Sequence, residues 1–251
     1  MVTNSLVAVL QARDNGGFCA ERRMELNALI KPLPCPVGAP QALRLYRVRL
    51  DVDWPVDEAL LAGLSEDERK RCLRYLRTIN QLQFALTRLA LRRLLAQETG
   101  LAPDALTFEL GAHGKPVLSL PGAPVFNVSH SGAYALIAIA RGGQVGVDIE
   151  TVQAMRDVPA LAEQTLLPGE LELCGHGRDV AAFFQLWTIK EAVLKAWGVG
   201  IAQHLSAFEA LELTNKELPL RIAAPERWPA TRAWALEAPD GYKATLAWAE
   251  R

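Results

Sequence analysis

The chain has 251 residues, of which 50% are hydrophobic and 22% are charged, so it is long and apolar enough to bury a substantial core and is not disordered. The formal net charge of −1 at pH 7 gives no overall attraction to nucleic acid or to an anionic membrane. The longest apolar runs fall well short of the roughly 20 residues that span a bilayer, and the four cysteines form no close pair. We therefore expect a soluble, cytoplasmic protein with reduced thiols.

The first half of the chain is predicted to contain an irregular tail, a strand, a long helix and several short strands. Residues 1–41 include an Asn-Gly-Gly turn signal and four prolines, which predict an irregular segment. Residues 44–52 alternate in polarity as a half-buried strand does. Ser65 is a good helix N-cap, and apolar side chains recur after it at helical spacing as far as Gly100. Short strands are predicted at 106–110, 117–120, 125–128 and 134–140.

The second half of the chain repeats this order of elements. A strand is predicted at 145–149 and a helix that ends at Trp197, and further strands are predicted near 208–213, 232–236 and 242–248. Two halves with one order of elements, residues 42–142 and 143–251, indicate an internal duplication, although no residue-level repeat is visible. Strands that flank long helices, with too few crossovers for a parallel sheet, favour an α+β fold.

The run Gly146-Val147-Asp148-Ile149-Glu150 places two acidic side chains on one face of its predicted strand. Residues two apart on a strand share a face, so Val147 and Ile149 point into the core, and Asp148 and Glu150 project together from the other side. Such a pair either forms a solvated strand face or holds a hard cation such as Mg²⁺, which is typically bound by one or two carboxylates and substrate phosphates. The spacing alone leaves both interpretations open.

The helix predicted over Phe183–Trp197 presents an acid and a base on one face. Glu191 and Lys195 lie one turn apart, which is typical of an exposed ion pair but also suits a catalytic pair. Lys190 adds another cation. Metal ligands, a candidate base and cations for the charge on phosphates are the groups that a phosphoryl-transfer site needs.

A third stretch, Phe126-Asn127-Val128-Ser129-His130-Ser131-Gly132, is predicted to be a strand that runs into a Ser/Gly turn. Such turn side chains often bond only local backbone, but two hydroxyls, an imidazole and exposed N–H groups can also donate hydrogen bonds to phosphate oxygens. The stretch does not match the Gly-x-Ser-x-Gly elbow of a hydrolase. A second tight turn carries Lys115 at its tip and does not have the spacing of a Walker A loop.

Taken in order, these stretches resemble the Sfp-type (surfactin-type) 4′-phosphopantetheinyl transferases. The sequence motif around Trp187 is similar to that of the W/KEA subgroup. The resemblance implies a pseudo-dimer of two similar α+β halves in one monomeric chain, and the halves would clasp coenzyme A. The residues that carry it are Gly114-Lys115-Pro116, Phe126-Asn127-Val128-Ser129-His130-Ser131, Gly146-Val147-Asp148-Ile149-Glu150, and Trp187-Thr188-Ile189-Lys190-Glu191-Ala192 followed by Lys195, Gly198 and Gly200.

The resemblance also implies a reaction and a role for each residue. The enzyme would move 4′-phosphopantetheine from coenzyme A to a serine of an apo acyl or peptidyl carrier protein, and would release adenosine 3′,5′-bisphosphate. Asp148, Glu150 and Glu191 would hold Mg²⁺. Glu191 would also take the serine proton, directly or through water, and Lys195 would stabilise the departing bisphosphate. The residues implied to contact the coenzyme are Lys115, Ser129, His130, Lys190 and Lys195. Of these, His130 is the implied partner of the 3′-phosphate.

One position departs from the family pattern. Family members often carry a basic residue midway along the first helix that contacts the 3′-phosphate of coenzyme A, whereas the best alignment here has Gln81-Leu82-Gln83. Arg71 or Arg88 is then the candidate for this contact.

The sequence also allows two other functions. The basic residues between Arg69 and Arg93 could bind RNA or DNA, but no aromatic side chains are interleaved as a stacking platform. Ser129 could instead serve a coenzyme A hydrolase, which would need no carrier protein. We therefore expect a Mg²⁺-dependent transferase that binds neither nucleic acid nor membrane.

Overall fold

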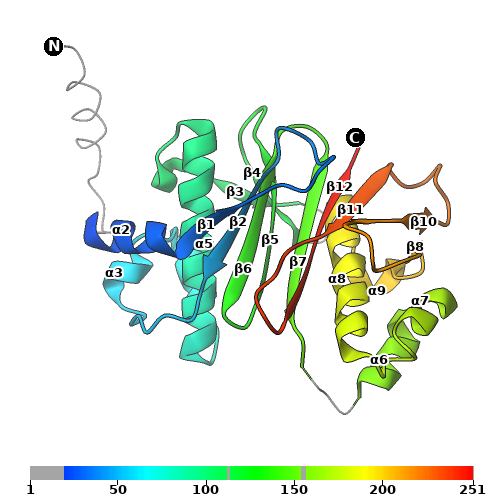
Figure 1. The fold of residues 1–251 in the computed structure, drawn as a ribbon. Helices are drawn as coiled ribbons and strands as arrows, with labels where there is room; N and C mark the ends of the chain where they lie inside the picture. Colours follow the sequence, from blue (N-terminus) through cyan, green and yellow to red (C-terminus); the bar gives the residue numbers. More distant parts are fainter. Residues whose placement is uncertain (1–19, 112–113, 154–156, 251) are drawn as a thin grey trace.

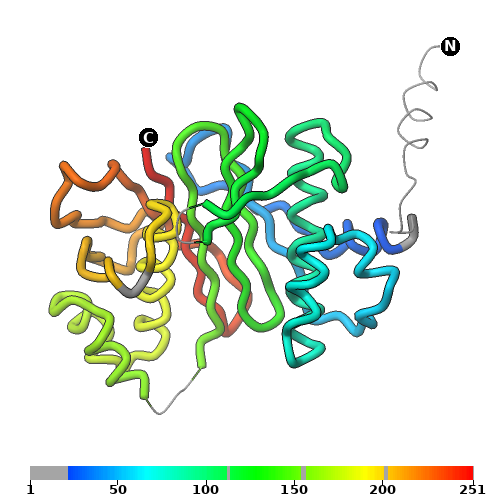
Figure 2. Tube along the Cα trace, turned by 180° about the vertical axis from the view of Figure 1, so that it is seen from behind, coloured from blue at the N-terminus to red at the C-terminus, as the bar shows by residue number. Residues whose placement is uncertain are grey.

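The protein consists of two antiparallel sheets that pack face to face, with a long helix on the outer side of each sheet (Figure 1). The structure is a computed structural model, which describes residues 20–111, 114–153 and 157–250. Seen from behind, the strands meet in the middle of the molecule and the helices lie at its two sides (Figure 2). This mixture of helices and antiparallel strands confirms the predicted α+β class.

The N-terminal half contains one main sheet, one long helix and a small separate sheet. In chain order, its elements are α2 (Ala20–Leu29), β1 (Ile30–Leu33), β2 (Arg44–Arg49), α3 (Glu58–Leu61), α4 (Glu66–Leu73), α5 (Thr78–Thr99), a 3₁₀ turn η1 (Pro103–Ala105), β3 (Phe108–Leu110), β4 (Pro116–Leu118), β5 (Val125–Ser131) and β6 (Tyr134–Ala140). The main sheet has the order β1-β2-β6-β5, and β3 pairs with β4.

The C-terminal half repeats this plan. Its elements are β7 (Gln144–Thr151), α6 (Val158–Thr165), α7 (Pro168–Leu173), α8 (Val180–Trp197), α9 (Ile201–His204), β8 (Phe208–Ala210), β9 (Glu217–Leu218), β10 (Leu220–Ile222), β11 (Thr231–Ala235) and β12 (Tyr242–Ala249). The main sheet has the order β7-β12-β11-β9, and β8 pairs with β10. In each half the first long strand pairs with the last strand, which pairs with the strand before it: β2-β6-β5 and β7-β12-β11. This shared topology confirms the predicted pseudo-dimer.

The sequence predicts an irregular segment over residues 1–41, and this prediction is wrong for residues 20–33. These residues form α2 and β1, and β1 pairs antiparallel with β2. Pro32 is tolerated there because β1 is an edge strand, where a missing backbone N–H need not interrupt a ladder. Leu26 and Leu29 are buried in the N-terminal core, so apolar burial fixes this segment. Residues 1–19 lie outside the described part of the chain.

The sequence predicts one long helix between Ser65 and Gly100, and the structure divides it into α4 and α5. Ser65 caps α4 as predicted, because its Oγ accepts from the Glu68 N–H and the Glu68 carboxylate accepts from the Ser65 N–H. At the break, the Gln81 side chain donates to the Tyr75 carbonyl oxygen at 2.8 Å. That bond satisfies a backbone acceptor that the interrupted helix leaves free.

Three apolar cores hold the layers together. One lies between α5 and the N-terminal sheet, and another lies between α8 and the C-terminal sheet. The third lies between the two sheets and includes Leu45, Leu136, Val147, Ile149 and Trp234. Val147 and Ile149 therefore point into a core, as predicted, and the two halves share that core.

Side-chain hydrogen bonds between β5 and β7 also join the halves. Asn127 and Ser131 share one face of β5, since they are four residues apart on a strand. Asn127 Oδ1 accepts from the Val147 N–H at 2.8 Å, and Ser131 Oγ accepts from the Thr151 N–H at 3.2 Å. Side chains of β5 thus satisfy backbone donors at the edge of β7, in place of a backbone ladder.

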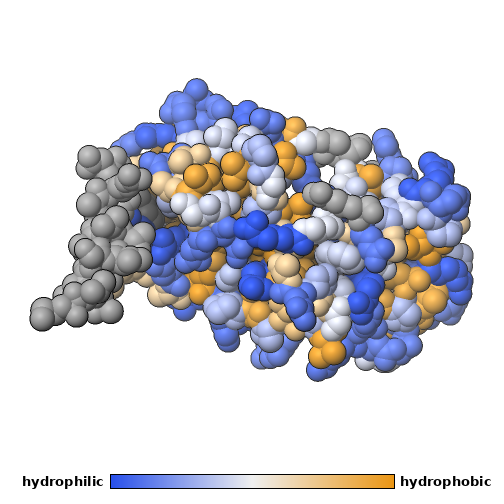
Figure 3. All heavy atoms as spheres, turned by 90° about the horizontal axis from the view of Figure 1, so that it is seen from above, coloured by the Kyte–Doolittle hydropathy of each residue, from blue (hydrophilic) through white to orange (hydrophobic). Residues whose placement is uncertain are grey.

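The upper end of the molecule in Figure 1 is seen from above in Figure 3. Hydrophilic residues cover most of this end, and apolar residues form small groups between them. Within the described residues, no helix has both the length and the apolar character needed to cross a bilayer.

Candidate active site

Asp148, in β7, is the centre of the candidate site. Its side chain is fully buried, with 0% exposed. Oδ1 accepts hydrogen bonds from Ser129 Oγ at 2.7 Å and from Lys195 Nζ at 2.6 Å. Among the described residues, nothing bonds to the buried Oδ2. Because buried polar atoms are almost always paired, this oxygen is available to a group that the chain does not supply.

A glycine allows α8 to lie directly against this face of β7. Gly146 is two residues before Asp148 and shares its face. A Cβ atom on Gly146 would lie 1.9 Å from the carbonyl oxygen of Ala192 in α8. The close approach of backbone to backbone brings Glu191 and Lys195 beside Asp148.

Lys195 links the two acidic groups. Its Nζ lies 2.6 Å from Asp148 Oδ1 and 3.0 Å from Glu191 Oε2, and the side chain is 22% exposed. Burial alone would lower the pKa of Lys195, but the negative charges of Asp148 and Glu191 outweigh burial and raise it. The lysine therefore stays protonated at neutral pH.

The other two carboxylates, Glu150 and Glu191, have raised pKa values. Burial, the charge of Asp148 and the charge of Glu191 raise the pKa of Glu150 to about 7. Burial and Asp148 also raise the pKa of Glu191, against the opposing charge of Lys195. A raised pKa makes Glu191 a stronger base than an exposed glutamate.

The donor set fits a hard divalent cation. Within the described residues, no group of three or more His, Cys, Asp or Glu side chains already converges as a metal site. Lys195 Nζ contacts both Asp148 and Glu191. However, Asp148 Oδ2 has no partner and Glu150 resists ionisation without a counter-charge. Carboxylate oxygens that need positive charge are the ligands that Mg²⁺ prefers.

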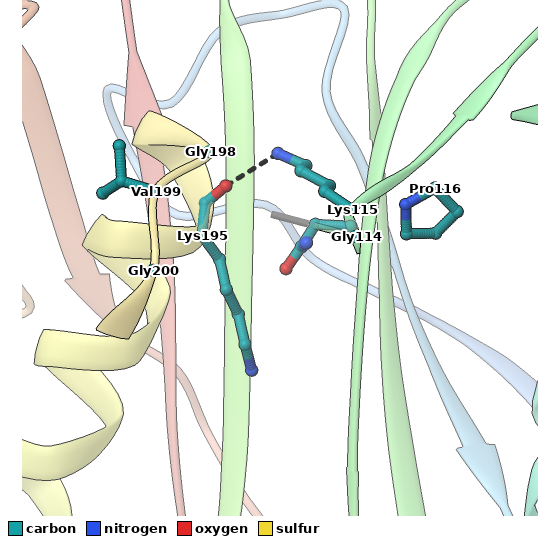
Figure 4. Close-up of a pocket in the computed structure, with 8 residues that line it drawn as sticks. Gly114, Lys115, Pro116, Lys195, Gly198, Val199 and Gly200 are labelled. Atoms are coloured by element: carbon teal, nitrogen blue, oxygen red, sulfur yellow. Dashed lines mark hydrogen bonds between the residues drawn. The ribbon is translucent and has the colours of Figure 1, made fainter. Parts of the chain in front are cut away.

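A pocket of about 270 Å³ opens beside Lys195, at the carboxyl end of α8. Lys115 Nζ donates to the carbonyl oxygen of Lys195 at 2.7 Å (Figure 4) and to that of Val145 at 3.1 Å. Burial and the charge of Lys195 lower the pKa of Lys115 to about 8. The pocket therefore has two lysines and suits an anion. Its lining residues are Gly114, Lys115, Pro116, Asn127, Lys195, Gly198, Val199 and Gly200.

Ser129 and His130 lie on β5 and not in a turn, which corrects the sequence prediction. The strand continues to Ser131 because β6 pairs with it to the end, and the turn follows at Gly132. As neighbours on a strand, Ser129 and His130 point to opposite faces. Ser129 is buried against Asp148, whereas His130 is exposed. Although part of the side chain is exposed, partial burial and the charge of Lys195 lower the pKa of His130.

Lys190 is not part of the site, which corrects its predicted role as a coenzyme contact. The side chain is fully buried in the C-terminal half. Its Nζ lies 2.7 Å from Glu170 Oε2 and donates to the carbonyl oxygens of Leu205 and Phe208, both at 2.8 Å. Adjacent residues of a helix point about 100° apart, so Lys190 and Glu191 face different surroundings. A lysine with these partners has no free contact to offer a ligand.

The arginine candidates line a groove of about 1,100 Å³ between α4, α5 and β3. Arg71 is exposed and lies 5.3 Å above the Phe84 ring. Arg88 is mostly buried, 3.4 Å from Glu68, and its Nη1 has no hydrogen-bond partner among the described residues. Pro116 lines both this groove and the Lys115 pocket, so the two cavities adjoin.

A third cavity, of about 260 Å³, lies at the other end of the acidic face. Glu150 lines it together with Phe183, Phe184 and Trp187 of α8. The sequence does not predict this cavity. Its only advance signal is the helical spacing of Phe183, Trp187 and Glu191, which places both aromatic rings on the face that carries the acid. The acidic cluster of Asp148, Glu150 and Glu191 thus lies between cavities on two sides.

The alternative functions lack the required contacts. Ser129 donates its hydroxyl proton to Asp148, and His130 on the opposite face cannot activate it, so a hydrolase nucleophile is not formed. Several basic residues of the α4–α5 region are already paired, since Arg69 contacts Glu58 and Arg92 contacts Glu68. These pairs balance part of the basic charge on which the nucleic-acid interpretation depends.

Comparison with known proteins gives matches along most of the chain. The profile of the 4′-phosphopantetheinyl transferase superfamily matches residues 144–247, and that of the N-terminal domain of 4′-phosphopantetheinyl transferases matches residues 55–141. The 4′-phosphopantetheinyl transferase HetI of Nostoc sp. is 33% identical over 77% of this chain and 81% of its own length. A Synechocystis sp. protein, named as a putative 4′-phosphopantetheinyl transferase, is 39% identical to this chain. The match covers 61% of this chain and 65% of that relative. Among solved structures, holo-[acyl-carrier-protein] synthase of Thermotoga maritima has a TM-score of 0.35 and 22% identity, over 43% of this chain and 63% of that one.

Proposed function

Because the chain belongs to the 4′-phosphopantetheinyl transferase superfamily, we propose that its buried acidic site transfers 4′-phosphopantetheine from coenzyme A to a serine of an apo acyl or peptidyl carrier protein. The products are the holo carrier protein and adenosine 3′,5′-bisphosphate. The observation that carries this proposal is the buried, unpartnered Oδ2 of Asp148 beside Lys195, with a cavity on either side.

Asp148, Glu150 and Glu191 are the proposed ligands of Mg²⁺. The cation, when bound, would supply positive charge against the pyrophosphate of coenzyme A. Binding at Asp148 Oδ2 would also relieve the repulsion that raises the pKa of Glu150. Lys195 already balances part of this charge through Asp148 Oδ1.

The coenzyme is proposed to occupy the Lys115 pocket and the adjoining arginine groove. Lys115 and Lys195 would contact phosphate oxygens, and Ser129 would hold Asp148 in place from the side. Arg71, Arg88 and the exposed His130 are the candidates for the 3′-phosphate. The acceptor serine would enter from the opposite side, through the cavity that Glu150 and Trp187 line.

The reaction is a displacement at phosphorus. The serine oxygen forms a bond to the phosphorus that carries the pantetheine arm, and the bond from that phosphorus to the bridging oxygen breaks. The electron pair of the broken bond stays on the bridging oxygen. That oxygen leaves as part of adenosine 3′,5′-bisphosphate, beside the protonated Lys195. The serine proton passes to Glu191, directly or through water, and the raised pKa of Glu191 favours that transfer.

Mass spectrometry of a carrier protein tests the function. Wild-type protein, coenzyme A, Mg²⁺ and apo carrier should give a carrier heavier by one phosphopantetheinyl group. Asp148→Asn should lower the rate by at least ~10²-fold, because it removes charge from the site while keeping the shape. Asp51→Asn, which changes an exposed aspartate, is the control. The absence of an adduct on acyl and peptidyl carriers alike, or a near-normal rate for Asp148→Asn, would reject the proposal.

Three finer assignments belong to the same proposal. The chain would act as a monomer, because both halves of the site come from one polypeptide. It would act in the cytoplasm, where coenzyme A is available. The Trp187 and Lys190-Glu191-Ala192 motif would place it in the W/KEA subgroup.

A further inference from the structure

A buried polar cluster joins α8 to the C-terminal sheet. Gln185 and Thr188 belong to α8 and Thr245 belongs to β12, and these residues are 8%, 0% and 0% exposed. The Thr188 hydroxyl donates to the Gln185 carbonyl oxygen at 2.9 Å. The Thr245 hydroxyl therefore donates the 2.9 Å bond between the two threonines, and it accepts from Gln185 Nε2 at 3.0 Å. We call Gln185, Thr188 and Thr245 the threonine cluster.

The threonine cluster lies directly beside the acidic site. Thr245 is the partner of Asp148 in the ladder between β12 and β7, so the two side chains lie on the same face of the sheet. Thr188 is one turn before Glu191 on the same side of α8, which packs against both strands (Figure 1). The bond between the threonines thus connects the strand position next to Asp148 with the helix turn next to Glu191.

Stability alone does not explain polar side chains at this place. The core between α8 and the C-terminal sheet is otherwise largely apolar, and valine has the shape of threonine. A buried hydrogen bond adds little net stability compared with an apolar pair of the same shape. It does restrict geometry, because a shift of α8 by ~1.5 Å, the rise of one helical residue, would break the bond between Thr188 and Thr245.

We propose that the threonine cluster positions Glu191 and Lys195 against Asp148 for transfer. This inference rests on the proposed function. The contact at Gly146 sets how closely the backbone of α8 approaches β7. The directional bonds of the threonine cluster then fix where α8 lies along the strands, and with it the carboxylate and ammonium groups of the site. A displacement of about 1 Å at such groups can lower a rate by ~10²-fold.

Two sets of substitutions separate positioning from stability. The triple variant Gln185→Met, Thr188→Val and Thr245→Val removes the side-chain hydrogen bonds of the threonine cluster and leaves no member of it unpaired. We expect its urea midpoint to equal or exceed that of wild type. Its kcat for transfer should fall by at least ~10-fold, with KM for coenzyme A within ~2-fold of wild type.

Serine variants give the opposite pattern. Thr188→Ser and Thr245→Ser keep the hydroxyl groups and each remove one buried methyl group. We expect both variants to unfold at lower urea concentration than wild type, because a small cavity is left in the core. Their kcat should stay within ~2-fold of wild type, since the bonds that place α8 remain.

Thr87→Val is the matched control. Thr87 is a buried threonine of α5, the long helix of the other half, and its Oγ1 has no hydrogen-bond partner among the described residues. The substitution removes a buried hydroxyl without breaking a bond of this kind. It should leave kcat and KM for coenzyme A unchanged and should not lower the urea midpoint.

The outcomes separate the two proposals. If wild type transfers the group and the triple variant keeps the wild-type kcat, the positioning role is wrong and the proposed function stands. A triple variant that unfolds more easily than wild type also rejects positioning, because the cluster then serves the fold. An equal loss of kcat in the serine variants rejects it as well, since the hydroxyls are then not what matters. If wild type modifies neither acyl nor peptidyl carriers, the proposed function fails and the positioning role fails with it.

Discussion

At the scale of single residues, the two roles proposed for Glu191, metal ligand and general base, make conflicting demands on its carboxylate. A metal-bound carboxylate is a weak base, whereas burial and the charge of Asp148 raise the pKa of Glu191. Its ion pair with Lys195, at 3.0 Å, holds the carboxylate beside Asp148 whichever role dominates. Replacing Glu191 with its neutral isostere glutamine should affect the two roles differently.

Glu191→Gln separates proton removal from metal binding. The amide keeps one oxygen ligand and the shape of the side chain but cannot accept the serine proton. We expect kcat to fall by at least ~10²-fold with a modest change in KM for coenzyme A, measured at saturating Mg²⁺. Full recovery of kcat at raised Mg²⁺ would show that Glu191 is a ligand alone and that the base is another group, such as a metal-bound water.

The burial of Lys115 should make the free energy of unfolding depend on pH. Its pKa is lowered from 10.5 to about 8, so between these pH values the unfolded chain binds a proton that the folded chain has released. The free energy of unfolding must then rise with pH across this range. We expect urea unfolding between pH 8 and 10.5 to show wild type gaining stability relative to Lys115→Met. Parallel curves for the two proteins would mean that Lys115 stays charged in the folded state.

At the scale of elements, the contact between β7 and α8 decides whether the site exists. Gly146→Ala would force α8 away from β7, because the new Cβ meets backbone atoms of Ala192 and Ala196. We expect a loss of stability of about 1–3 kcal/mol or more, and a loss of transfer activity from displacement of Lys195. Thermal unfolding and the transfer rate measure these effects.

Gly169→Ala is the matched control for that contact. A Cβ there would lie 2.2 Å from Oε1 of Glu209, which is the flexible end of a side chain and can move away. The control should keep both stability and activity. Equal behaviour of the two variants would show that backbone contact with α8 does not position the site.

At the scale of the whole molecule, the halves are held by the shared core and by the side chains of β5. Asn127→Ala removes the acceptor of the buried Val147 N–H and should cost about 1–3 kcal/mol, because that donor is left without a partner. Ser131→Ala removes a comparable bond at a partly exposed position, where water can replace it, so it should cost less. Denaturant unfolding of both variants checks the order, and a smaller loss for Asn127→Ala contradicts it.

Much of the chemistry follows from local spacing. The alternation of β7 places Asp148 and Glu150 opposite Val147 and Ile149, and the helical repeat pairs Glu191 with Lys195. These relations hold because strand and helix periods are properties of the backbone, and they do not depend on what packs around them. The order of elements likewise predicts two similar α+β halves.

Contacts between distant segments were decided only by the tertiary structure. The spacing cannot show that Lys195 and Ser129 both bond Asp148, or that Lys190, next to Glu191, is buried against Glu170. Pairing with β6 extends β5 through His130, and burial of leucines orders α2. Burial, edge pairing and the sum of nearby charges depend on which segments meet, and a local pattern holds no information about partners brought together by chain folding.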